Sequence, residues 1–338
     1  IPAALYAVQK EGFAQCAALN KERDFSFLTT PFNGSVPTLS EKLTAAQYED
    51  GAFRISQSGL RLFSTCPAQW FLSSALSIDE EDTDAELFNP RYIGIICHRI
   101  LERLYQRIRE TDRVFISAHL ADYRTWAESI FNETVHSQTD FRGPLAAPFI
   151  ESIKKRSLKS VDFVLAFDAE KLDGYAPYLM EGELQHRSGD ILYHGLVDRI
   201  AYQEAEGRAV ILDYKTGGIP AASDYQQNPM RDFQIPMYIF LAENELKQEV
   251  LHAFFLGITK EERKYIVNDK EVIPQDSSRS SKTREEFEPS IQAFLQIAQE
   301  YAQQIGMEDF RKPAAVQWQD CMECPFHTIC RTTFTVEE

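Results

Sequence analysis

An aspartate and a lysine at the end of an apolar run are the residues best placed to do chemistry in this sequence. The run Val210-Ile211-Leu212 is followed by Asp213-Tyr214-Lys215. Side chains alternate between the two faces of a strand, so Asp213 and Lys215 share a face, with their α-carbons roughly 7 Å apart. A second acid, Asp198, lies in the preceding strand of a predicted hairpin. Two carboxylates and a lysine can hold a divalent cation beside a reacting anion, as metal-assisted phosphodiester hydrolysis requires.

The alternative for these residues is a structural role, because an Asp-x-Lys pair on a strand is usually a surface ion pair. The apolar run beside Asp213 instead predicts a buried strand, where unpaired charge is expensive. Perturbed buried charges are more often functional than structural. We therefore expect Asp198 and Asp213 to belong to a functional site.

Four of the six cysteines form a pattern: Cys66 lies far upstream of Cys321-x2-Cys324-x5-Cys330, while Cys16 and Cys97 stand apart. No secretory signal accompanies them, so metal ligation is favoured over disulfides. Four thiolates can bind Zn²⁺ or a [4Fe–4S] cluster. The single distant ligand favours iron–sulfur, because a zinc ribbon usually draws its ligands from two nearby knuckles. Closing so long a loop predicts a structural role for the cluster.

Composition limits the possible partners. With 338 residues, of which 44% are hydrophobic, the chain is long enough for a large core or two domains. No apolar run reaches membrane-spanning length, and no secretory signal is recognisable, so we expect a cytoplasmic protein that does not bind membranes. The sequence lacks an initiator Met, so we also expect a fragment of a longer protein or a processed product.

The net charge of −16 argues against a generally basic nucleic-acid surface. Any DNA path must then be a local groove. The candidates for the groove are Arg99, Arg103, Arg107, Arg109, Arg113, Lys154, Lys155, Arg156 and Lys159. The same basic residues could equally lie on solvated helix faces.

Hydrophobic periodicity predicts the elements that position these residues. Ser56 caps a helix, and Pro67 suits the first turn of the next one, with Cys66 at the junction. The other predicted helices span about 92–109, 117–136, 148–170, 232–246 and 285–306, and the predicted strands about 178–186, 191–202, 208–215 and 250–258. The polar residues 260–282 are expected to form a protruding loop or ribbon. This order indicates an α/β core preceded by a helical insertion.

We expect four segments. They are a poorly defined N-terminal segment (1–54), a helical region with the first cluster cysteine and the histidine motif (55–177), the core (178–310) and a C-terminal cysteine segment (311–338). Residues 55–338 are expected to form one compact domain.

Taken in order, four motifs resemble those of a known family. They are Gly94-x-x-x-His98, Gly195-x-x-Asp198, Asp213-Tyr214-Lys215-Thr216-Gly217 and Gln234-x-x-x-Tyr238. The series resembles the RecB-type branch of the PD-(D/E)XK nucleases over roughly Ile55 to Arg331. The resemblance implies a restriction-endonuclease-like core, a mixed central sheet flanked by helices, with an N-terminal helical decoration.

The resemblance also implies roles for individual residues. Asp198 and Asp213 would bind a divalent metal, with His98 as a further ligand. Lys215 would orient the attacking water and stabilise charge on the phosphate. Hard oxygen ligands suit Mg²⁺ or Mn²⁺. The implied catalytic set is Asp198, Asp213, Lys215, Gln234 and Tyr238.

Two further features come from the same resemblance. Glu183, on the first strand, lies near where related proteins carry a glutamate. The cysteines Cys66, Cys321, Cys324 and Cys330 resemble the iron–sulfur staple of the AddB subunit and of CRISPR-associated RecB-like nucleases, with Zn²⁺ as the less favoured metal.

The implied function is a Mg²⁺- or Mn²⁺-dependent deoxyribonuclease, expected to be an exonuclease. It would process single-stranded or duplex DNA ends in recombinational repair. The chain has no Gly-x4-Gly-Lys-Ser/Thr loop, which fits the C-terminal domain of a larger helicase–nuclease subunit with a partner subunit. The alternatives are a stand-alone RecB-like or CRISPR-associated exonuclease, a catalytically silent DNA-binding module, and a zinc interaction domain whose acids are structural.

Overall fold

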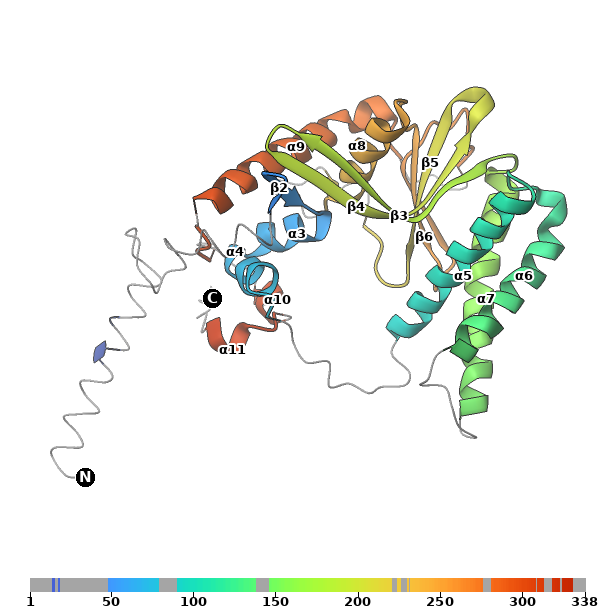
Figure 1. Cartoon of the computed structure of the whole chain (residues 1–338), viewed down its shortest axis with the longest axis horizontal. Coiled ribbons are helices and arrows are strands. Elements are labelled where there is room, and N and C mark those ends of the chain that lie inside the picture. Colours follow the sequence, from blue (N-terminus) through green and yellow to red (C-terminus); the bar gives the residue numbers. More distant parts are fainter. Residues whose placement is uncertain are drawn as a thin grey trace, which may run out of the picture. The chain divides into compact units, whose positions relative to one another are not determined.

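The computed structural model shows a chain of helices and strands (Figure 1). The chain separates into two compact units. The structure describes residues 48–78, 90–137, 146–220, 232–275, 281–307, 309–312, 318–322 and 324–330, with a few isolated positions besides. Unit 1 comprises Ile1–Asp82, Arg187–Leu192 and Leu295–Glu338, and unit 2 comprises Thr83–His186 and Tyr193–Phe294. Most of the segment 1–54, including Cys16, lies outside the described residues. The four segments expected from the sequence follow different boundaries and stay a prediction.

A mixed sheet forms the centre of unit 2. β4 (Ile191–Gln203) pairs antiparallel with β5 (Arg208–Lys215), and β5 pairs parallel with β6 (His252–Gly257). β3 (Ala176–Ser188) pairs with β4, while β7 (Glu262–Val267) pairs antiparallel with β6. β7 lies within the polar stretch expected to be a loop or ribbon. The predicted α/β architecture with a mixed central sheet flanked by helices is confirmed.

Three helices cover one face of this sheet. α5 (Pro90–Thr111), α6 (Leu120–Ser137) and α7 (Ala146–Lys171) share a buried core with Val210, Leu212 and Tyr214 of β5. The intervening residues of β5 point to the opposite face, where α8 (Gln234–Leu246) contacts Asp213. The alternation predicted along β5 is therefore found, and it separates the core residues from the charged pair.

A charged pair is buried between the helices and the sheet. Arg199 of β4 donates to both oxygens of Asp168 of α7, at 2.6 and 2.7 Å, and each residue is at most 2% exposed. Tyr105 of α5 donates its hydroxyl to Asp168 at 2.6 Å, and its ring stacks against the Arg199 guanidinium. This network ties α5 and α7 to the strand that carries Asp198.

Unit 1 contains the segments that precede and follow the core in the sequence. β1 (Tyr48–Glu49) pairs with β2 (Ala52–Ile55), and α3 (Gln57–Thr65) is capped by Ser56, whose hydroxyl accepts from the Gly59 N–H at 3.1 Å. α4 (Pro67–Trp70) begins with Pro67, as predicted, and runs into a π-helical turn (Phe71–Ala75). α9 (Arg284–Gly306) has residues in both units, and α10 (Trp318–Met322) and α11 (His327–Cys330) follow it.

Aromatic rings join these unit 1 segments. Phe63 contacts Tyr301, and Trp70 stacks on Phe310.

Among the described residues, every helix is too short or too polar to span a lipid bilayer.

Candidate active site

Asp198 lies where β4 and β5 separate. The described pairing of the two strands ends at Arg199 opposite Leu212. Asp198 Oδ2 then accepts the backbone N–H of Tyr214 at 2.6 Å. A carboxylate rather than a backbone carbonyl thus holds the strands together at this point, which fixes Asp198 beside the Asp213-Tyr214-Lys215 segment.

His98 reaches the same point from α5. Its Nδ1 lies 2.7 Å from Glu181 Oε1 and 3.7 Å from Asp198 Oδ1, and its Nε2 lies 3.2 Å from the carbonyl oxygen of Tyr214. A carbonyl oxygen only accepts, so Nε2 must carry a proton. In the neutral imidazole the lone pair is then on Nδ1, directed at the two carboxylates, which is the arrangement of a metal-binding histidine with a backbone partner.

His98, Glu181 and Asp198 form a three-residue cluster whose ligand atoms all lie within 4.8 Å of one another. Their side chains are between 12% and 27% exposed, so the cluster is recessed yet open to a substrate. The sequence singled out two of its members and missed Glu181.

The glutamate suggested by the resemblance, Glu183, lies elsewhere. It is two residues further along β3 and 3.4 Å from Nδ1 of His194. Glu181 has a φ of +43°, and a β-carbon on Gly182 would lie 2.2 Å from Leu179 Cδ1. Such a backbone irregularity breaks the simple alternation of the strand. The signal in the sequence was Gly182, because a glycine inside a strand often marks a bulge.

Asp213 and Lys215 lie next to this cluster and are joined through α8. Lys215 Nζ lies 2.7 Å from Asp213 Oδ2 and 2.7 Å from Gln234 Oε1. The Gln234 amide nitrogen donates to Asp213 Oδ1 and to the Tyr238 hydroxyl. Asp213 is therefore held by Lys215 and Gln234, outside the three-residue cluster, and its role as a metal ligand stays a prediction.

Tyr238 extends this chain of contacts back to β4. Its hydroxyl donates to the carbonyl of Leu196 at 2.5 Å. The approach depends on Gly195, where a β-carbon would lie 3.1 Å from the Tyr238 ring. Gln234 and Tyr238, members of the implied catalytic set, thus position Asp213 and Lys215 relative to β4.

Burial and like charge shape the protonation of the acids. Burial and the charge of Asp213 raise the pKa of Asp198 well above its usual value. Burial also raises the pKa of Asp213, although the Lys215 charge opposes it. Buried acids that repel each other electrostatically favour protonation or a bound cation.

His98 supplies positive charge to this cluster. Burial lowers the pKa of His98, but the hydrogen bond to Glu181 and the charge of Asp198 raise it to about 9. At neutral pH the protonated imidazole therefore brings a positive charge next to Glu181 and Asp198. A divalent cation fits the same place, because Glu181 and Asp198 offer oxygen ligands and deprotonated His98 offers a nitrogen.

Three of the nine basic residues considered for a DNA groove form ion pairs with acids. Arg103 pairs with Glu133, Lys154 with Glu128 and Lys159 with Glu261. Arg107 instead lies over the Trp126 ring. Arg99 is exposed and directly follows His98.

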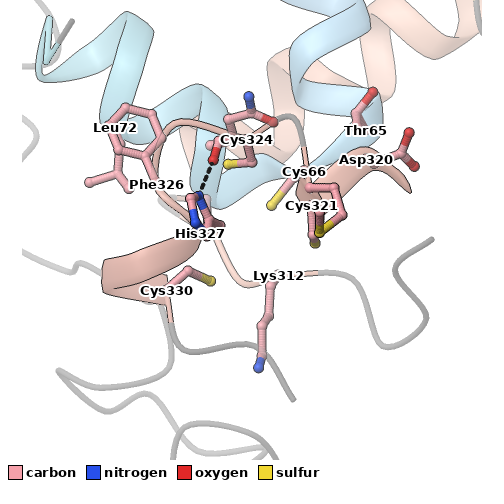
Figure 2. Close-up of a pocket in the computed structure, with 13 residues that line it drawn as sticks. Thr65, Cys66, Leu72, Lys312, Asp320, Cys321, Cys324, Phe326, His327 and Cys330 are labelled. Carbon is pink, nitrogen blue, oxygen red and sulfur yellow. Dashed lines mark hydrogen bonds between the residues drawn. The ribbon is translucent and has the colours of Figure 1, made fainter. Parts of the chain in front are cut away.

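Four cysteines surround a separate pocket in unit 1. Figure 2 shows Cys66, Cys321, Cys324 and Cys330 around one hollow, a pocket of about 150 Å³. None of the four is in a disulfide bond, and neither is the buried Cys97. Burial raises the pKa of the Cys66 thiol, and the nearby Cys330 and Cys324 raise it further. Thiolates at these positions would need a cation to offset their mutual repulsion.

Comparisons with known proteins agree with this geometry. An "Uncharacterized protein" of Treponema pallidum (strain Nichols) is 34% identical over 145 residues. The match covers 43% of this chain but only 18% of that relative's length. The family model for the PD-(D/E)XK nuclease superfamily matches residues 54–331. The chain therefore belongs to the PD-(D/E)XK nuclease superfamily, whose members are generally nucleases that use divalent metals.

Proposed function

We propose that this chain is a deoxyribonuclease of the RecB/AddB type that hydrolyses phosphodiester bonds at DNA ends, with Mg²⁺ or Mn²⁺ as its metal. The observation that carries the proposal is the recessed cluster of His98, Glu181 and Asp198 directly beside the Asp213–Lys215 pair. Buried like charges of this kind are costly unless they bind something, so they favour a functional role over a structural one.

Four residues would hold the metal. His98 would bind through Nδ1, and Glu181 and Asp198 through their carboxylate oxygens. Asp213 retains accepting capacity, because an ionised carboxylate has about four lone-pair sites and the described contacts use two of them. When bound, a divalent cation supplies charge neutralisation on the phosphate and lowers the pKa of a coordinated water.

Lys215 would act on the substrate as a donor and a positive charge. Its ammonium group has three N–H donors, and two of them face Asp213 and Gln234. The third is free to orient the attacking water or to stabilise a non-bridging phosphate oxygen as charge develops. Gln234 and Tyr238 are positioning residues in this account, because they fix the ammonium group without reaching the phosphate.

The biological setting we propose is end processing in recombinational repair, within a larger helicase–nuclease. The relative is several times longer than the segment it shares with this chain, which supports a domain inside a larger protein. The other candidates are a free-standing exonuclease and a catalytically silent DNA-binding module. The size of the protein that carries this sequence in cells would distinguish the free-standing exonuclease from a domain of a helicase–nuclease.

A cleavage assay tests the nuclease. End-labelled single-stranded and duplex DNA would be incubated with Mg²⁺ or Mn²⁺, and exonuclease action would release short products from an end. Asp213→Asn and Lys215→Gln should each lower cleavage by at least about 10²-fold, because both groups act next to the reacting phosphate. Asp162→Asn, at an exposed helix position, is the matched control. Cleavage at the wild-type rate by either site variant, or none by the wild type in either metal, refutes the proposal.

We also propose that the cysteine pocket of unit 1 holds a [4Fe–4S] cluster with a structural role. The support is the convergence of four cysteines, none in a disulfide bond, from chain segments far apart in sequence. Four thiolates suit this cluster and Zn²⁺ alike. Metal analysis and the visible absorbance of anaerobically purified protein separate the two, since only the iron cluster gives a brown protein.

A further inference from the structure

Two exposed aliphatic residues lie close in sequence to members of the His98–Glu181–Asp198 cluster of unit 2. In the described part of unit 2, the exposed large apolar side chains are those of Ile95, Tyr178 and Leu196. The Tyr178 ring contacts Tyr202. Ile95 is 50% exposed and Leu196 is 54% exposed. Single exposed apolar residues are common on protein surfaces, and these two differ from such residues by their position beside the cluster residues in sequence.

Each of the two residues shares a face with a member of the cluster. Ile95 precedes His98 by three positions in α5, which places both on neighbouring positions of one helix face. Leu196 precedes Asp198 by two positions in β4, so both leave the same side of the strand. His98 Nδ1 and Asp198 Oδ1 are 3.7 Å apart, so the helix that carries Ile95 and the strand that carries Leu196 approach each other at this cluster.

The backbone at or next to Ile95 and Leu196 contacts residues of the candidate active site. The carbonyl of Leu196 accepts from Tyr238, which in turn contacts Gln234. Ile95 follows Gly94, whose absent β-carbon leaves room for Thr216 beside Lys215. The aliphatic groups are therefore presented on regular, anchored elements.

The groups attached to a bound phosphodiester indicate which ligand the Ile95 and Leu196 side chains would contact. A phosphodiester at the cluster brings a sugar and a base with it, and these have apolar surface while the phosphate has none. In a duplex, the base faces are covered by stacking on their neighbours. In a single strand the faces are accessible, and Leu or Ile side chains are among those that proteins insert against unstacked bases.

We propose that Ile95 and Leu196 pack against the unpaired nucleobase next to the scissile phosphate and so determine a preference for unpaired ends. This inference rests on the proposed nuclease function and adds a specificity determinant to the same site. The two residues contact the base and sugar, whereas the cluster and Lys215 contact the phosphate.

The test compares three probes of one length at a fixed salt concentration in Ca²⁺. They are a single-stranded oligonucleotide, the same backbone with abasic sites throughout, and a blunt duplex. The variant Ile95→Gln/Leu196→Thr keeps good helix and strand formers at exposed positions. Met307→Gln, which changes an exposed apolar residue of unit 1, is the control. Fluorescence anisotropy gives the dissociation constants.

The double variant should bind the base-bearing single strand about five- to tenfold more weakly, as expected for losing two half-buried aliphatic contacts. Its affinity for the abasic strand and for the duplex should stay at the wild-type value. An equal loss on the abasic strand, or no loss at all, overturns the inference. If the wild type cleaves DNA but the variant shows no base-dependent loss, this inference alone fails. If the wild type neither binds nor cleaves nucleic acid, the proposed function fails with it.

Discussion

Gly94 of α5 and Thr216, the residue after Lys215, approach each other so closely that a β-carbon on Gly94 would lie 3.0 Å from Thr216 Cγ2. Two residues of separate motifs thus set how near α5 comes to the end of β5. His98 lies one turn further along α5, so the same contact fixes the distance between the imidazole and Lys215.

Gly94→Ala should therefore impair cleavage without unfolding the protein. Alanine favours a helix over glycine by about 1 kcal/mol, which offsets much of the crowding against a movable threonine. The displaced Thr216 would shift Lys215, and small misplacements at a reacting centre can lower rates by about 10²-fold. We expect a loss of at least about tenfold in cleavage rate.

A second change checks the cause. Gly94→Ala/Thr216→Ser removes the crowded methyl group and should recover most of the activity. Gly306→Ala, at a helix glycine with open space around it, is the control. An inactive double variant, together with a fully active Thr216→Ser, would show that the contact is not responsible.

Glu181 and Glu183 offer a matched pair for the metal site. Glu181→Gln removes the carboxylate of a proposed metal ligand, so Mg²⁺ affinity and cleavage should fall together, by at least about tenfold in affinity. Glu183→Gln changes the same side chain two residues away, beside His194, and should have little effect on either. Isothermal titration with Mg²⁺ and the cleavage assay give both quantities. Equal effects of the two substitutions would contradict the assignment.

The contrast between these glutamates shows where sequence reasoning succeeds and where it stops. The strand that ends at Lys215 was predictable because an apolar run with period-two alternation is a local signal. The junction at Cys66 was predictable from Ser56 and Pro67, which are also local signals. The position of Glu181 depends on a backbone irregularity with positive φ, which a strand pattern does not specify.

Contacts between residues far apart in the chain were also not predictable from the sequence. Nothing local links Arg199 to Asp168, because the two are brought together only when α7 packs on the sheet. The convergence of His98 with Asp198 was suggested only by the resemblance of ordered motifs. Periodicity alone places each residue on an element and leaves the packing of the elements open.

The buried Arg199–Asp168 pair should be strongly coupled. Arg199→Met leaves Asp168 as an uncompensated buried charge and should lower the free energy of unfolding by about 3–5 kcal/mol. Arg199→Met/Asp168→Leu removes both charges and should recover much of the loss. For the exposed pair, Arg124→Met should change stability by about 0–1 kcal/mol. Denaturant unfolding measures all three, and a double variant no more stable than Arg199→Met would argue against the coupling.

His252 should make stability depend on pH. It is fully buried, its Nδ1 lies 2.9 Å from Asn268 Oδ1, and its Nε2 has no hydrogen-bond partner among the described residues. Burial lowers the pKa of His252, although Asn268 partly opposes this. The unfolded chain therefore takes up a proton near pH 6.5 while the folded chain resists it, so stability is lost as pH falls below that value.

The substitution His252→Gln isolates this contribution. Glutamine can donate to Asn268 but does not titrate. The fall in unfolding free energy between pH 7 and pH 5 should be smaller in the variant, by about 1.4 kcal/mol for each unit by which the folded pKa is depressed. Parallel pH profiles for the two proteins would show that His252 does not titrate differently on folding.

The cysteine pocket can be tested without disturbing the helix junction at Cys66. Cys66 lies between α3 and α4 in an extended conformation and is the N-cap residue of α4. Serine is a favoured N-cap residue, so Cys66→Ser preserves or improves the local backbone while removing the thiolate. Cys97→Ala removes a buried thiol outside the pocket and serves as the control.

If the four thiols bind one metal cluster, ligation is coupled to folding, and losing a ligand releases the loop that the cluster closes. Cys66→Ser should then lose most of its bound iron and melt at a lower temperature, with both changes appearing together. Cys97→Ala should keep its iron, whatever its effect on packing in the core of unit 2. Elemental analysis and thermal melting give the two readings. Full iron content in Cys66→Ser would remove Cys66 from the ligand set, and zinc in place of iron in the wild type would replace the cluster with a zinc site.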